Sequence, residues 1–196
     1  RLFGALSFPK MMRWGESPFR FSRPIHGLLC VFGGRPVATE FDGFKATNET
    51  VGHRIAAPGP VEAGDLASYR AVLEKSFVIV DPADRKKMIL DQIEAALAPL
   101  KAKAYPDAEL LDDLTLNVEH PLVIFGSFPE TYLSLPLEVL ATAMREGQKL
   151  FSVVRDSKQL ACFLGVADAA GDAKGLIRQG NERVLRARLA DARFFW

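Results

Sequence analysis

The chain has 196 residues, of which 48% are hydrophobic and 25% are charged, the proportions of an ordinary globular protein with a sizeable core. Its formal net charge at pH 7 is +1, which excludes a protein whose whole surface attracts nucleic acid, so any RNA-binding surface must be a local patch. Every apolar run is shorter than the roughly 18–20 residues that a membrane span needs, and no membrane partner is expected.

Short strands and one helix are expected in the first part of the chain. Residues 25–32 form a dense apolar run that predicts a buried strand, and a Gly-Gly pair ends it. Residues 36–41 alternate between apolar and polar side chains and would pair with that strand as a hairpin. Residues 42–60 are rich in Gly and Pro, which predicts a loop or an irregular strand. Asp65 is expected to begin the helix.

From there to residue 178, helices and strands interleave. Asp81 and Pro82 suit the N-cap and the first position of a helix, and Gly147 is expected to cap another helix at its C-terminus. The interleaving predicts an α/β or α+β domain over residues 1–178, with a mixed sheet and packed helices. The expected elements are a strand at 77–80, helices at 82–102, 106–118 and 137–146, a strand at 122–125, and a hairpin of strands at 151–154 and 160–166 that turns near Asp156 and Ser157.

The last stretch, residues 180–196, predicts an amphipathic helix. Asn181 is the expected N-cap. The chain then ends on three aromatic residues, an apolar patch that a partner or a following part of the polypeptide is expected to cover. One face of the helix would carry Leu185, Leu189, Ala192 and Trp196, and another would carry Arg183, Arg186 and Arg193.

Motifs of common catalytic sites are absent from the sequence, which has no Walker A loop, no GxSxG elbow, no GxGxxG after a strand and no zinc spacing. We therefore predict no catalytic residue and no metal ligand. Of the three histidines, His26 is expected in the core and His120 is expected to cap or pack. His53, beside Arg54 in a Gly-bounded loop, would either bind a phosphate or carboxylate or belong to a turn held by side-chain hydrogen bonds. The cysteines, Cys30 and Cys162, lie in separate apolar runs and indicate buried free thiols in a reducing cytoplasm.

Seven blocks of sequence, spread over nearly the whole chain, follow the pattern of one family. They are FPKMMRWG at 8–15, FSRPIH at 21–26, TVGHRI at 50–55, VD and RK within 80–86, VEHP at 118–121, LEVLATAMREGQKLF at 137–151 and GNERVLRARLADARFF at 180–195. In this order they resemble the β subunit of the bacterial tetrameric glycyl-tRNA synthetase. Two positions depart from the family pattern, since His120 stands where Trp is usual and Ser152 stands where Pro is frequent.

The resemblance implies an enzyme that joins glycine to tRNA(Gly), with ATP and Mg used by the active site of a separate α subunit. The β subunit would bind tRNA and support the α subunit in the cytoplasm. Residues 1–178 would then form a domain like the B3/B4 domain of the phenylalanyl enzyme, and residues 179–196 would lead to an HD-like region. The expected partners are the α subunit, tRNA(Gly) and the remainder of the β subunit, and neither a membrane nor DNA.

Exposed cations and aromatic residues are the candidate contacts. Lys10 and Arg13 lie beside Trp14, where they would meet a nucleic-acid backbone next to a stacking ring, or where Trp14 would pack and the cations stay solvated. Two alternatives to tRNA handling stay open: a purely structural interaction domain, and an editing-like hydrolase that uses His53. The candidate RNA contacts are Lys10, Arg13, Arg54, Lys149, Arg183 and Arg186, and the candidate interdomain residues are Arg188, paired with Asp191, and Phe194, Phe195 and Trp196.

Overall fold

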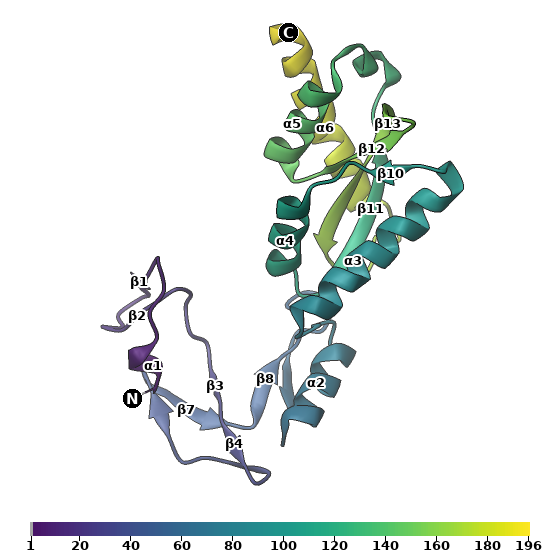
Figure 1. Ribbon diagram of the computed structural model, residues 1–196. Helices are drawn as coiled ribbons and strands as arrows, with labels where there is room; N and C mark the ends of the chain where they lie inside the picture. The colour runs from purple at the N-terminus through teal and green to yellow at the C-terminus, as the bar shows by residue number, and fades with distance from the viewer. Residues whose placement is uncertain (1) are drawn as a thin grey trace. The chain divides into compact units, whose positions relative to one another are not determined.

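The computed structural model describes residues 2–196 and has the predicted α/β or α+β character (Figure 1). Contacts within the chain divide it into two compact units, of which the first ends at Ser76 and the second covers Phe77–Trp196. The sequence-based division after residue 178 does not coincide with this one, because the C-terminal helix belongs to the second unit. None of the helices within residues 2–196 is long and apolar enough to cross a membrane.

The first unit is built from very short strands and one longer helix. It has four antiparallel pairings, β1 with β2, β4 with β5, β6 with β7 and β8 with β9, and one parallel pairing that adds β3 to β7. Mixed strand directions therefore occur in the sheet β3-β7-β6. The elements are α1 (Leu2–Ala5), β1 (Met12–Arg13), β2 (Arg20–Phe21), β3 (Leu28–Leu29), β4 (Val31–Phe32), β5 (Arg35–Pro36), β6 (Glu40–Phe41), β7 (Phe44–Thr47), β8 (Glu49–Val51), β9 (Pro60–Glu62) and α2 (Leu66–Lys75).

The predicted buried strand over residues 25–32 is wrong. The run contains β3 and β4 as separate short strands, His26 is exposed instead of lying in the core, and the Phe32 side chain is 85% exposed. No apolar side chain within residues 3–62 is fully buried, and aromatic rings such as Phe19 and Phe41 pack against one another in small clusters instead. A dense apolar run predicts burial, but this part of the chain supplies no core to bury it.

The second unit is a four-stranded sheet with helices on both faces. The strand order is β10-β12-β13-β11, and every neighbouring pair is antiparallel. Residues 77–80 precede α3 without forming the predicted strand. The elements are α3 (Pro82–Leu97), a 3-10 turn (Ala98–Leu100), β10 (Lys103–Ala104), α4 (Ala108–Asn117), β11 (Pro121–Ser127), a 3-10 helix (Glu130–Ser134), α5 (Leu137–Gln148), β12 (Phe151–Arg155), β13 (Lys158–Asp168) and α6 (Leu176–Phe195).

Alternation along β13 divides the second unit into two cores. Cys162 and Leu164 point to the core that α3 and α4 cover, and Phe163 between them points to the core that α5 and α6 cover. The first core includes Ile89 and Ile93, from the predicted buried stripe of α3. The second core includes four side chains that are each at most 1% exposed, namely Leu140, Met144, Leu185 and Leu189. Two layers of helices therefore cover the two faces of the sheet.

Two predicted helix ends, at Asp65 and Asp81, are confirmed, and two, at Gly147 and Asn181, are wrong. Asp65 and Asp81 accept hydrogen bonds from the backbone N–H groups of Ser68 and Ala83, at 2.7 and 2.9 Å, and so begin α2 and α3 as expected. Gly147 does not cap α5. It lies inside that helix, where a Cβ would fall 2.6 Å from Cδ of Arg188, so the glycine lets α6 approach closely. The C-cap of α5 is Lys149, in the left-handed conformation at φ 55°.

Helix α6 begins five residues before the predicted N-cap. Gly175 precedes the helix with φ at 65°, and the Asp172 carboxylate accepts hydrogen bonds from the N–H groups of Ile177 and Arg178, at 3.1 and 2.9 Å. Asn181 lies within the helix, where its side-chain Oδ1 accepts a hydrogen bond of 3.1 Å from Nε2 of Gln148 on α5. The packing of α6 against α5 thus outweighs the roughly 1 kcal/mol that a glycine at position 180 costs inside a helix.

Candidate nucleic-acid interface

All six candidate RNA-contacting cations are exposed, and five of them are in no ion pair with any described residue. They are divided between the two units. Three lie in the first unit, at Lys10, Arg13 and Arg54, and the others lie on α5 and α6 of the second.

The β1–β2 hairpin carries the first pair of candidates. Arg13 lies in β1 directly opposite Arg20 of β2, and both side chains are exposed. Trp14, at the end of β1, is half-buried and donates its indole N–H to the backbone oxygen of Phe21 at 3.1 Å. Trp14 therefore packs within the hairpin and the cations next to it are exposed, while their contact with nucleic acid stays a prediction.

The loop at His53 is a turn held by a side chain, as one of the two interpretations predicted. Nδ1 of His53 accepts hydrogen bonds from the N–H groups of Ile55 and Ala56, at 3.3 and 3.0 Å. That nitrogen therefore uses its lone pair within the turn and cannot act as a general base there. Arg54 projects from the same turn and is exposed.

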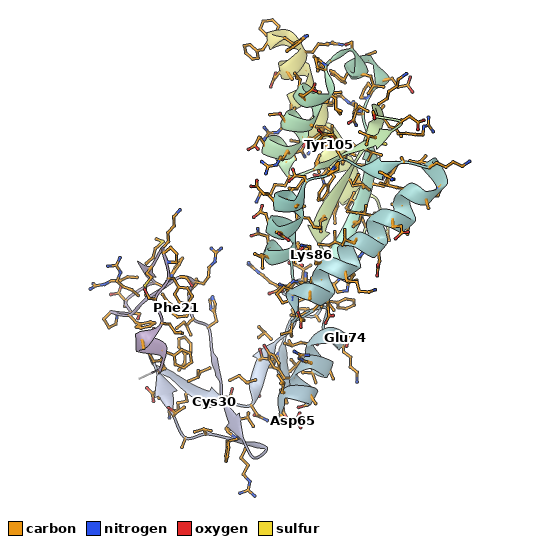
Figure 2. The ribbon with its side chains drawn as sticks, viewed as in Figure 1. Phe21, Cys30, Asp65, Glu74, Lys86 and Tyr105 are labelled. Carbon is orange, nitrogen blue, oxygen red and sulfur yellow. The ribbon has the colours of Figure 1, made fainter. Side chains whose placement is uncertain are left out.

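Lys149 differs from the other candidates because its ammonium group is paired with the Asp113 carboxylate, across 36 residues of sequence. This hydrogen bond lowers the pKa of Asp113 below its ordinary value of 3.8. The surroundings are acidic. Arg145 binds three carboxylates at the rim of a cavity of about 350 Å³. Tyr105, which is labelled in Figure 2, lines the same cavity. The three are Asp107 at 2.6 Å, Glu109 at 2.8 Å and Glu146 at 2.6 Å. An RNA phosphate would be repelled by this surface.

Helix α6 presents Arg183 and Arg186 to solvent, while Leu185 between them is buried in the core. The expected ion pair between Arg188 and Asp191 does not form in the described structure, because Arg188 lies along α5 at Gly147.

The aromatic end of α6 is open. Phe194, Phe195 and Trp196 are 83%, 84% and 73% exposed, so the apolar patch predicted at the end of the helix is present. Arg193 lies over the ring of Tyr132 at 5.0 Å.

His120 and the two cysteines have simple structural roles. The His120 ring packs edge-on against Phe77, with ring centroids 5.3 Å apart, so it takes an aromatic packing position as predicted. Both thiols are free, and Cys162 is buried as expected while Cys30 is only partly buried. Burial raises the pKa of the Cys162 thiol to about 11, which makes it unreactive near neutral pH.

Three further cations of the first unit, Arg20, Arg23 and Arg35, were not singled out from the sequence. The local composition indicated a basic patch there, because residues 2–36 contain a single carboxylate, Glu16. The pairing of Arg20 with Arg13 was not visible, because it depends on the register of the hairpin.

Comparison with known proteins gives one family for the whole chain. The family model described as glycyl-tRNA synthetase beta subunit matches residues 1–196. Among relatives named glycine–tRNA ligase beta subunit, the protein of Syntrophotalea carbinolica is 42% identical and that of Desulforudis audaxviator 45%, both over the whole chain. The protein of Moorella thermoacetica is 43% identical over 98% of the chain. The chain spans about 29% of the length of the first two relatives and 28% of the third. With its full length matched by the family model, the chain belongs to the glycyl-tRNA synthetase β subunit family.

Proposed function

We propose that this chain is a tRNA-binding and scaffolding part of a β subunit that supports the ATP-dependent attachment of glycine to tRNA(Gly) in the cytoplasm. The observation that carries the proposal is the set of five exposed cations without carboxylate partners among residues 2–196, in a chain of this family. ATP and Mg would be used by the α subunit, and the chain by itself would not aminoacylate. We keep Lys10, Arg13, Arg54, Arg183 and Arg186 as the proposed RNA contacts and give Lys149 the least weight, because Asp113 neutralises it.

Scaffolding is supported by the apolar surfaces that the two units leave uncovered. The end of α6 exposes three aromatic side chains, and residues 3–62 bury no apolar side chain fully. Surfaces of this kind are typical of sites that contact another protein segment. We propose that the remainder of the β subunit, including an HD-like region, packs on Phe194, Phe195 and Trp196, and that the α subunit is the second protein partner.

A titration of the chain with tRNA(Gly) at low salt tests the RNA-binding half of the proposal. Phosphate contacts dominate such affinity, so binding should weaken steeply as salt rises, with a slope of log Kd against log salt set by the number of contacts. No binding near ~10⁻⁴ M, about the weak end of non-specific affinity, would leave the chain with a structural role only.

A purely structural interaction domain is the second candidate, and the uncovered apolar surfaces favour it. Co-purification with the α subunit, in the presence and absence of tRNA(Gly), distinguishes this candidate from tRNA binding. The third candidate, an editing-like hydrolase centred on His53, has little support, since Nδ1 of that residue holds its own turn together.

A further inference from the structure

We propose that the tip of the β4–β5 hairpin is a contact for single-stranded RNA, in which the Phe32 ring stacks on an unpaired base and the Arg35 guanidinium binds a neighbouring phosphate. This inference rests on the proposed function, because it takes RNA as the ligand. It goes further in naming a site outside the contacts proposed above, the type of RNA, and the two parts of the RNA that are recognised.

Phe32 and Arg35 lie on the same face of the hairpin. They are directly opposite each other in the antiparallel pair β4–β5, and the Cβ atoms of such a pair are about 4.5–5.5 Å apart. Val31 and Pro36 form the adjacent pair and belong to the opposite face, because side chains alternate along a strand. Val31 lines a cavity of about 410 Å³ within the first unit, together with side chains of α2 such as Leu66. The face that carries Phe32 and Arg35 therefore points away from this cavity.

A tight turn fixes the tip of the hairpin. Gly33 and Gly34 have φ values of 58° and 77°, and a two-residue type I′ turn needs a positive φ at both positions. A Cβ at either glycine would meet no atom within 4 Å, so the turn projects freely. At the base of the hairpin, Val37 donates its N–H to the backbone oxygen of Cys30 at 2.9 Å. Cys30, labelled in Figure 2, donates its own N–H to Thr47 of β7 at 3.1 Å, which ties the hairpin to that strand.

Both side chains at the tip are open to a ligand. Phe32 is 85% exposed, the largest value among the large apolar side chains of residues 3–196. Its ring is in no aromatic or cation–π contact with another described residue. Arg35 is exposed and is in no ion pair with the residues that the structure describes. The tip thus presents a flat apolar ring and a cation side by side.

A single strand of RNA matches this combination. An aromatic face binds a base by stacking, and a guanidinium binds a phosphate through charge-assisted hydrogen bonds. A base is available for stacking only where it is unpaired, which favours a single strand over a duplex. The surrounding charge agrees, because residues 2–36 carry five basic side chains and a single acidic one. An apolar pocket on a protein would also accept the ring of Phe32, but it offers no anion to Arg35.

The test separates the ring from the charge. Phe32→Trp keeps an aromatic face, Phe32→Leu keeps an apolar side chain without one, and Arg35→Gln removes the charge. Arg70→Gln, which removes an exposed cation from α2 of the same unit, is the control for Arg35→Gln. The probes are a single-stranded RNA of about 12 nucleotides, the same sequence as a duplex, tRNA(Gly), and inorganic polyphosphate of similar charge. A thermal melt of each variant shows that it is folded.

We expect Phe32→Leu to bind single-stranded RNA about tenfold more weakly than the parent chain, and Phe32→Trp to bind it at least as tightly, because the contact is stacking. Neither substitution should change binding to polyphosphate, which has no bases. Arg35→Gln should weaken binding to both probes relative to Arg70→Gln. It should also reduce the salt slope for single-stranded RNA by about 0.7, which corresponds to one phosphate contact.

Equal binding of single-stranded RNA by Phe32→Leu and the parent chain overturns this inference, and so does an equal effect of Phe32→Leu on the duplex. Loss of co-purification with the α subunit in Phe32→Leu, at unchanged RNA binding, overturns it as well and assigns the tip to a protein partner. In each of these cases, tRNA(Gly) binding by the parent chain leaves the proposed function standing. Absence of binding to any of the three RNAs overturns both.

Discussion

Replacing Gly126 with alanine tests how tightly the second unit is packed. Gly126 of β11 is paired with Phe163 of β13, and a Cβ built on it would fall within 3.0 Å of three carbons of the Phe163 ring. That ring is completely buried in the core under α5 and α6, so it cannot move into solvent. Forcing a methyl group into such a core costs about 1–3 kcal/mol. Alanine in a strand recovers about 0.5–1 kcal/mol of backbone entropy, which leaves a net loss of up to about 2.5 kcal/mol, and the three close contacts with a completely buried ring favour the upper part of that range.

Urea denaturation followed by circular dichroism measures this loss as a fall in the midpoint at unchanged slope. Gly171→Ala is the matched control, because a Cβ at Gly171 meets no atom within 4 Å and its φ is not positive, so we expect no loss there. In a Phe163→Leu background, Gly126→Ala should cost less than it does in the parent chain, because the shorter side chain leaves room for the methyl group. A Gly126→Ala protein as stable as the parent would refute this account of the core.

Three further predictions concern stability. Arg20→Thr should raise the stability of the chain by roughly 0.2–1 kcal/mol at low salt, and less at high salt, because it removes the repulsion with Arg13. A loss of stability would contradict the like-charge argument. Leu189→Ala, in a fully buried position, should cost about 2–5 kcal/mol in a urea melt, whereas Leu176→Ala on the exposed first turn should cost far less. The backbone hydrogen bond from Arg178 lowers the pKa of Asp172 below 3.8. The contribution of the Asp172 carboxylate to the stability of the folded chain is therefore present above pH 3.8 and is lost as pH falls through the lowered pKa. Asp172→Asn should therefore flatten the fall in stability below about pH 4, and an unchanged acid profile would exclude that residue as its cause.

Elements of the second unit could be predicted because local signals and packing agree there. The spacing of Ile89 and Ile93 identified the buried face of α3, and Asp81 identified its start. The turn at Asp156 and Ser157, both with positive φ, joins β12 to β13 as expected for a two-residue hairpin loop.

The first unit could not be predicted in the same way. Residues 25–32 have the composition of a buried strand, but composition does not say which other residues provide the burial, and within residues 3–62 no apolar side chain is fully covered. The start of α6 was missed for a related reason. Gly180 indicates a break by its own propensity, and contacts such as that between Asn181 and Gln148, 33 residues apart, decide the outcome.

The candidate site was predictable as a set of exposed cations, and less so as an arrangement. Exposure of Arg183 and Arg186 follows from helical spacing around Leu185. The pairing of Lys149 with Asp113 and the facing positions of Arg13 and Arg20 depend on tertiary contacts and on strand register, which no local pattern contains.

The central claim is that this part of the β subunit handles tRNA. Its most direct test is steady-state glycylation by the α subunit with a full-length β subunit that carries Arg183→Glu and Arg186→Glu in the numbering of this chain. Lys86→Glu with Lys87→Glu, on α3, is the charge-matched control. The account predicts a KM for tRNA(Gly) at least about tenfold higher than that of the control, with the KM values for glycine and ATP unchanged, since phosphate contacts dominate binding to RNA. A KM for tRNA(Gly) equal to that of the control enzyme would contradict it.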